Sequence, residues 1–106
     1  MAEDFLNTLE ATIRSRRGGD PATSYTAKLF GRGRAKIAQK VGEEAVETVI
    51  AALQDDRAGL VGEATDLLFH LMVLLADAGL SLDDIRAEMV RREGVSGIDE
   101  KAARKP

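Results

Sequence analysis

Two pairs of carboxylates beside a long apolar stretch place the strongest constraint on how this chain can fold. Glu44 and Glu47 stand three residues apart, and so do Glu63 and Asp66. On a helix this spacing puts both side chains of a pair on one face, with Cβ atoms about 5–6 Å apart. The second pair leads into residues 67–75, all but one of which are apolar. The sequence therefore places carboxylates at the margin of a hydrophobic core.

Charges at the edge of a core are costly unless they are paired or bind a metal. Residues 59–76 contain no Lys or Arg that could pair with the carboxylates, so a divalent cation is the simplest partner. Mg²⁺ prefers oxygen ligands and is commonly shared between carboxylates and substrate phosphates. A metal in such a place polarises a phosphoryl oxygen, neutralises a leaving diphosphate and lowers the pKa of a water. The pattern favours hydrolysis of a phosphoanhydride.

The chain is predicted to be helical throughout, and proline occurs only at positions 21 and 106, so nothing between them forbids helix. Apolar spacing and capping residues predict helices at 3–17, 25–30, 35–53 and 58–77, another from Ser81 to about Arg92, and loose helix in the tail at 94–106. Residues 31–34 are expected to form a flexible basic loop. The short link at 54–57 is typical of antiparallel neighbours. We therefore expect one all-α domain over residues 1–106, a small antiparallel bundle of four to five helices.

The apolar faces of the two long helices predict the core. On the first, the expected buried stripe is Ile37, Val41, Ala45, Thr48, Val49 and Ala52. On the second, it is Leu60, Ala64, Leu67, Leu68, Leu71 and Leu75. Phe69, Met72, Val73 and Leu74 extend the apolar surface around the second helix, so one small bundle does not cover it. We expect a homodimer in which this helix packs against its partner.

Glycines at positions 42 and 62 each cost about 1 kcal/mol against alanine inside a helix. They are explained if a helix backbone or the substrate approaches closely beside the carboxylates.

Basic residues close to the acidic pairs are candidates for binding phosphates. Fifteen basic and 18 acidic side chains give a net charge of -3, so there is no bulk electrostatic case for nucleic acid or membrane. Any basic site must be local. The candidates near the pairs are Lys28, Arg32, Arg34, Lys36 and Lys40, and those in the tail are Arg91, Lys101 and Arg104.

The absence of cysteine suits a reducing compartment, and the acidic start lacks the charged-then-apolar order of a signal peptide. We expect a cytoplasmic protein.

A single E-x-x-E pair on a helix is usually a solvated face, whereas two pairs beside apolar faces favour metal binding. Glu43 is expected to face solvent or to support the metal site from outside rather than to ligate the metal. His70 is expected to be a hydrogen-bonded core residue, and a supporting role beside the metal stays open.

The acidic residues match the E-x-x-E and E-x-x-D signature of the all-α, MazG-like nucleotide pyrophosphohydrolase superfamily. Glu44-x-x-Glu47 and Glu63-x-x-Asp66 are separated by fifteen residues. The blocks at 25–30, 40–47, 63–70 and 96–101 resemble, more narrowly, the phosphoribosyl-ATP pyrophosphohydrolase family of histidine biosynthesis. A mild departure is Phe69, where the family often has tyrosine.

The resemblance implies a Mg²⁺-dependent enzyme that converts phosphoribosyl-ATP and water into phosphoribosyl-AMP and pyrophosphate, the second step of histidine biosynthesis. It implies that Glu44, Glu47, Glu63 and Asp66 are metal ligands, with one of them or Glu43 orienting the attacking water. It also implies a helical homodimer.

Two other interpretations stay open. One is a housecleaning hydrolase of non-standard nucleoside triphosphates, against which the scarcity of aromatic residues counts mildly. The other is a non-enzymatic helical dimer whose acidic rows are solvated surface.

Overall fold

The computed structural model describes residues 4–94 and the single positions 97, 101 and 104. It contains the helices α1 (Phe5–Ser15), α2 (Tyr25–Arg32), α3 (Arg34–Leu53), α4 (Arg57–Asp77) and α5 (Leu82–Arg92). No strand occurs among these described residues, which confirms the all-α prediction. The ends of the expected helices agree closely with the observed ones. The loose helix expected at 94–106 falls almost entirely outside the described residues.

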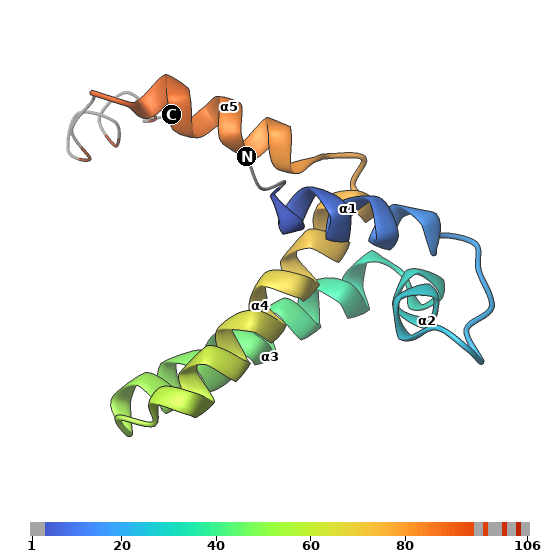
Figure 1. The fold of residues 1–106 in the computed structure, drawn as a ribbon, viewed down its shortest axis with the longest axis horizontal. Coiled ribbons are helices and arrows are strands. Elements are labelled where there is room, and N and C mark those ends of the chain that lie inside the picture. Colours follow the sequence, from blue (N-terminus) through green and yellow to red (C-terminus); the bar gives the residue numbers. More distant parts are fainter. Residues whose placement is uncertain (1–3, 95–96, 98–100, 102–103, 105–106) are drawn as a thin grey trace.

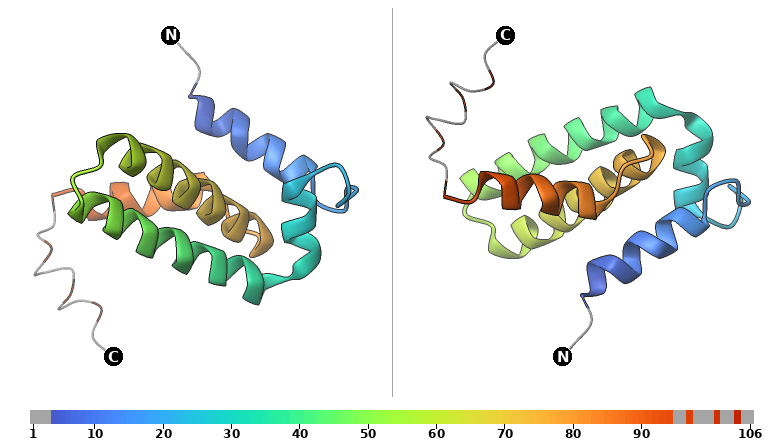
Figure 2. Two further views of the ribbon diagram at one scale, coloured as in Figure 1. Left: turned by 90° about the horizontal axis from the view of Figure 1, so that it is seen from below. Right: turned by 90° about the horizontal axis from the view of Figure 1, so that it is seen from above.

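The long helices α3 and α4 form an antiparallel hairpin, and the other helices lie at or beyond its open end (Figure 1). α1 packs on α4, and α2 packs on both α3 and α4 at the open end of the hairpin. α5 follows α4 after a tight turn (Figure 2), and Figure 1 shows that it diverges from the hairpin instead of lying along it. The closed end of the hairpin, near residues 54–56, has no such cover from the first two helices.

Local sequence signals set the helix ends. Ser24, Asp56 and Ser81 cap the N-termini of α2, α4 and α5 by accepting a backbone N–H bond with their side chains. Gly33 separates α2 from α3 with φ 92°, a backbone conformation that suits glycine alone. The expected flexible loop at 31–34 is therefore wrong, because the break in the helical path is confined to Gly33.

The core lies at the open end of the hairpin, where α1, α2, α3 and α4 meet. Its buried members are Ile13, Leu29, Ile37, Met72, Val73 and Ala76. The buried stripes expected for the long helices are partly wrong. Leu68 and Leu71 are each 39% exposed and Val49 is 56% exposed, whereas Met72 and Val73 are buried within the single chain. The prediction from periodicity assumes that another segment packs along the whole length of each long helix. Within one chain, α1 and α2 supply such a segment only at the open end of the hairpin.

The closed half of the hairpin therefore leaves a broad apolar surface uncovered. The exposed apolar residues of this half are Val46, Val49, Ile50 and Leu53 on α3 and Val61 on α4, and Leu68 and Leu71 are exposed further along α4. Length and hydropathy alone would let α4 cross a membrane, as they would the core helix of a soluble protein. Exposed clusters of apolar side chains often mark a contact with another molecule.

Gly42 and Gly62 have open space beside them. A Cβ atom at either position would meet no atom within 4 Å. Close approach of another helix of the same chain is therefore not the reason for these glycines. The expected close approach beside the carboxylates stays a prediction for a bound molecule or a second chain.

Candidate functional site

Three carboxylates converge in the middle of the hairpin. Glu44 comes from α3, and Glu63 and Asp66 come from α4. One oxygen of each lies within 4.8 Å of the others. The antiparallel pairing of the two helices produces this contact, because it brings the second acidic pair alongside the first. We call Glu44, Glu63 and Asp66 the acidic cluster.

Glu44 is the buried member of the acidic cluster. The residue is only 7% exposed, and its Oε2 atom has no hydrogen-bond partner among the described residues. Its Oε1 atom lies 3.9 Å from Lys40 Nζ, at the far limit of an ion pair. A buried carboxylate oxygen without a partner is costly, and a cation would supply that partner. Three carboxylates around one point are a ligand set that suits a hard divalent cation such as Mg²⁺.

The pKa of the Glu63 carboxyl group is affected by the neighbouring carboxylates of the acidic cluster. Its pKa is raised, first because the group is partly desolvated, and then by the hydrogen bond and the charge of Glu44. The charge of Asp66 acts in the same direction, whereas a hydrogen bond with Glu47 lowers the pKa. Repulsion within the acidic cluster therefore adds to the effect of desolvation at Glu63, and a bound cation would relieve that repulsion.

The other two predicted carboxylates lie beside the acidic cluster. Glu47 is exposed and lines a small cavity of about 160 Å³ next to Glu63. Glu43 is exposed too, and its carboxylate accepts hydrogen bonds from Gln39 Nε2 at 2.8 Å and Lys40 Nζ at 3.4 Å. These two bonds, that of Gln39 first, lower the pKa of Glu43. The structure thus brings together three of the four predicted metal ligands, with Glu47 adjacent to them.

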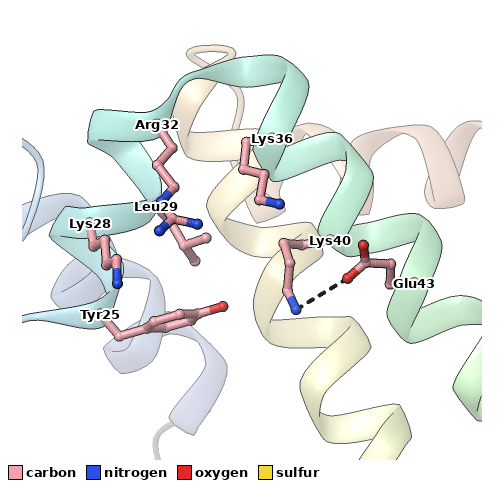
Figure 3. Close-up of a pocket in the computed structure, with 7 residues that line it drawn as sticks. All are labelled: Tyr25, Lys28, Leu29, Arg32, Lys36, Lys40 and Glu43. Carbon is pink, nitrogen blue, oxygen red and sulfur yellow. Dashed lines mark hydrogen bonds and ion pairs between the residues drawn. The ribbon is translucent and has the colours of Figure 1, made fainter.

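A basic pocket of about 200 Å³ opens between α2 and α3 (Figure 3). Four cations line it, together with Tyr25, Leu29 and Glu43: they are Lys28, Arg32, Lys36 and Lys40. Four of the residues predicted to bind phosphates are therefore brought together. Figure 3 shows that side chains from the two helices face one another across this basic pocket. Because Lys40 also contacts Glu43 and Glu44, the basic pocket adjoins the acidic cluster.

The remaining predicted basic residues do not line the basic pocket. Arg34 Nε donates to Asp77 Oδ2 at 2.6 Å, and its guanidinium also donates to the Asp77 carbonyl at 3.2 Å. It therefore stabilises the C-terminal end of α4, where carbonyls lack helical partners. Lys101 and Arg104 are exposed at isolated described positions and do not line the pocket.

Tyr25 is a pocket residue that the sequence analysis did not single out. Its hydroxyl lies 2.9 Å from His70 Nε2, and His70 Nδ1 lies 2.7 Å from the main-chain carbonyl of Asp66. A carbonyl only accepts, so Nδ1 donates to it and, in the neutral imidazole, the hydroxyl donates to Nε2. The buried His70 is thus a hydrogen-bonded core residue, as expected. Tyr25 could have been found from its position, because Lys28 and Arg32 follow at helical spacing on one face.

Known proteins match the chain over nearly its whole length. The phosphoribosyl-ATP pyrophosphatase of Rhizorhabdus wittichii is 66% identical, over 93% of this chain and 93% of that protein. The protein of the same name from Azospirillum brasilense is 60% identical over 99% of both chains. That of Rhodospirillum rubrum is 60% identical over 96% of this chain and 87% of that protein.

The match to a family description covers the helices that build both parts of the site. Residues 6–93 match the sequence model for phosphoribosyl-ATP pyrophosphohydrolase, a range that contains the acidic cluster and every residue lining the basic pocket. This agrees with the resemblance of the four sequence blocks and with the identity to the three bacterial relatives. The chain belongs to the phosphoribosyl-ATP pyrophosphohydrolase family.

Proposed function

We propose that this protein hydrolyses phosphoribosyl-ATP to phosphoribosyl-AMP and pyrophosphate in a Mg²⁺-dependent reaction, the second step of histidine biosynthesis. The observation that carries the proposal is the acidic cluster, with oxygens within 4.8 Å of one another, beside a pocket lined by four cations. The first suits a divalent cation and the second suits phosphates. Membership of the family supplies the substrate.

The residues of the acidic cluster would hold the metal, because Glu44 has a buried oxygen without a partner among the described residues and lies close to Glu63 and Asp66. Glu47, adjacent to Glu63, is the further candidate ligand. When bound, Mg²⁺ supplies charge neutralisation for the phosphoryl group and the leaving diphosphate.

The protein's own side chains carry the rest of the reaction. Lys28, Arg32 and Lys36 bind substrate phosphates, which the acidic cluster alone would repel. Glu43 lies on the pocket wall, and hydrogen bonds from Gln39 first and then Lys40 lower the pKa of its carboxyl, which favours the ionised form. A carboxylate in that state accepts hydrogen bonds, so Glu43 is placed to orient the attacking water. Lys101 and Arg104, which lie in the tail, remain candidates for contacts with the substrate's additional phosphate.

We further propose that the protein works as a homodimer in the cytoplasm. A groove of about 380 Å³ between α1, α4 and α5 supports the dimer, because its lining is mostly apolar: it includes Leu6, Leu68, Leu71, Leu75, Leu82, Ile85 and Met89. A second chain would cover this groove and the exposed face of α4.

The proposed activity is tested by incubating purified protein and Mg²⁺ with phosphoribosyl-ATP, and in parallel with a panel of nucleoside triphosphates, while measuring pyrophosphate. We expect release from phosphoribosyl-ATP at a kcat/KM well above that for any ordinary triphosphate. Faster release from a non-standard triphosphate would identify a housecleaning hydrolase instead. No release from any of them would leave a non-enzymatic helical module.

A further inference from the structure

Lys40 lies at the boundary between the acidic cluster and the basic pocket. Its Nζ atom is 3.4 Å from Glu43 Oε1 and 3.9 Å from Glu44 Oε1. The same side chain lines the basic pocket, where Figure 3 shows it between Glu43 and Tyr25. Among the described residues, Lys40 is the one cation of the basic pocket that lies within ion-pair distance of a carboxylate of the acidic cluster.

The contact with Glu44 places Lys40 in competition with any metal ion. The Glu44 side chain is only 9% exposed, and apart from Lys40 its carboxylate has no cationic neighbour within ion-pair distance among the described residues. A metal ion bound by Glu44 would carry positive charge close to the Lys40 ammonium. Two like charges repel at this range, so both cannot stay on one carboxylate without cost.

We propose that Lys40 is the counter-ion of Glu44 in the metal-free protein and that it moves toward the substrate phosphates when the metal binds. This inference rests on the proposed function and adds a role for one residue in coupling the two halves of the site. Lysine suits the role, because its ammonium is a compact charge on a flexible stem and its Nζ already faces the pocket.

The exchange makes metal and phosphate ligands bind cooperatively. A metal ion on Glu44 releases the ammonium, which is then free to contact a phosphate in the basic pocket. Phosphate in the pocket attracts the same ammonium, which frees Glu44 for the metal. Such coupling between two sites is reciprocal by thermodynamic necessity.

The test uses Lys40→Met, which keeps an unbranched apolar stem and removes the charge. Titration calorimetry of the metal-free protein with MgCl₂, without substrate, should show a Kd for Mg²⁺ lower by about fivefold or more. At saturating Mg²⁺, KM for phosphoribosyl-ATP should rise. These effects have opposite signs, whereas structural damage would weaken both kinds of binding.

Lys28→Met is the matched control, because it removes the same charge from the α2 wall of the same pocket. It should raise KM and leave the Mg²⁺ affinity close to wild type. Lys40→Arg keeps the charge and should also keep the wild-type Mg²⁺ affinity. Thermal unfolding with and without MgCl₂ checks folding, and Lys40→Gln repeats the titration if the methionine variant does not fold.

An unchanged or weaker Mg²⁺ affinity in Lys40→Met would overturn the proposal, as would equal tightening in Lys28→Met. If the wild-type protein binds Mg²⁺ and turns over substrate, such a result removes the role of Lys40 alone. If the wild-type protein shows no heat of Mg²⁺ binding and no metal-dependent rise in unfolding temperature, the metal site and this inference fail together.

Discussion

At the scale of single residues, Glu44 occupies the least favourable place for a charge in this site. It is buried on α3, faces two other carboxylates, and has one distant ammonium as its partner. Folding tolerates such an arrangement only at a cost in stability. The metal-dependent hydrolysis proposed above would account for this cost, because the unpartnered Glu44 oxygen would bind the metal ion.

The first prediction concerns the ligands. Glu44→Gln and Asp66→Asn keep the shape of each side chain and remove the charge, so pyrophosphate release should fall by about 100-fold or more. Glu47→Gln should lose less, because Glu47 lies outside the acidic cluster. Glu93→Gln, an exposed carboxylate at the end of α5, is the control. Wild-type rates in both cluster variants would rule out the ligand assignment.

The second prediction concerns stability without metal. The raised pKa of Glu63 means that the folded protein binds its proton more tightly than the unfolded chain does. The free energy of unfolding therefore falls as the pH rises from about the ordinary value of 4.5 through the raised pKa. In EDTA, Glu63→Gln should be more stable than wild type at pH 7, with the advantage vanishing below that ordinary value. Chemical unfolding across this pH range measures it, and a less stable variant at pH 7 would contradict the account.

The sequence predicted the residues of the acidic cluster because their spacing is local to each helix. It could not predict which of the neighbouring basic residues meet. Arg32 and Arg34 are close in sequence, yet Gly33 places them on different helices and Arg34 binds Asp77 instead. The bond between Tyr25 and His70 joins residues far apart in the chain, so no local pattern indicates it.

At the scale of elements, the helix boundaries were predictable because capping residues and glycines act locally. Ser24, Asp56 and Ser81 open helices, and Gly33 ends one. The buried faces of α3 and α4 were not predictable to the same degree. Burial depends on which distant segment packs on each face, and α1 and α2 cover only one end of the hairpin.

The third prediction concerns the junction of α2 and α3, which sets the two walls of the basic pocket. Gly33 has φ 92° and ψ 169°, a region open almost only to glycine, so Gly33→Ala should lower the free energy of unfolding by about 1–3 kcal/mol. Gly31→Ala is the matched control. It lies inside α2 with open space around it, and should raise stability by up to about 1 kcal/mol. Urea unfolding of both variants decides, and equal effects would contradict the role of Gly33.

At the scale of the whole molecule, one chain does not bury its own apolar surface. Beyond the open end, which α1 and α2 cover, α3 and α4 are covered mostly by each other. Leu53 at the closed end of the hairpin is 83% exposed. A stable homodimer would account for this surface, and obligate interfaces of this kind bury about 2,000 Å² or more.

The fourth prediction separates the dimer interface from the core. Leu71 is 39% exposed in the apolar groove, so Leu71→Glu should give a folded monomer in sedimentation experiments at micromolar concentration. Met72 is 3% exposed, so Met72→Glu should unfold the chain. Leu80→Glu, at a 45% exposed position outside the groove and outside the exposed face of the hairpin, is the control. A wild-type monomer, or a dimer retained by Leu71→Glu, would show that this face does not mediate assembly.

The central claim is that the acidic cluster and the basic pocket together hydrolyse phosphoribosyl-ATP with a divalent metal. Its most direct test follows both products from phosphoribosyl-ATP, with wild-type protein and Glu44→Gln side by side, in EDTA and after restoring MgCl₂. The account predicts equal amounts of phosphoribosyl-AMP and pyrophosphate from the wild-type protein with Mg²⁺, and almost none in EDTA or from the variant. Equal rates with and without metal, or full activity in Glu44→Gln, would contradict it.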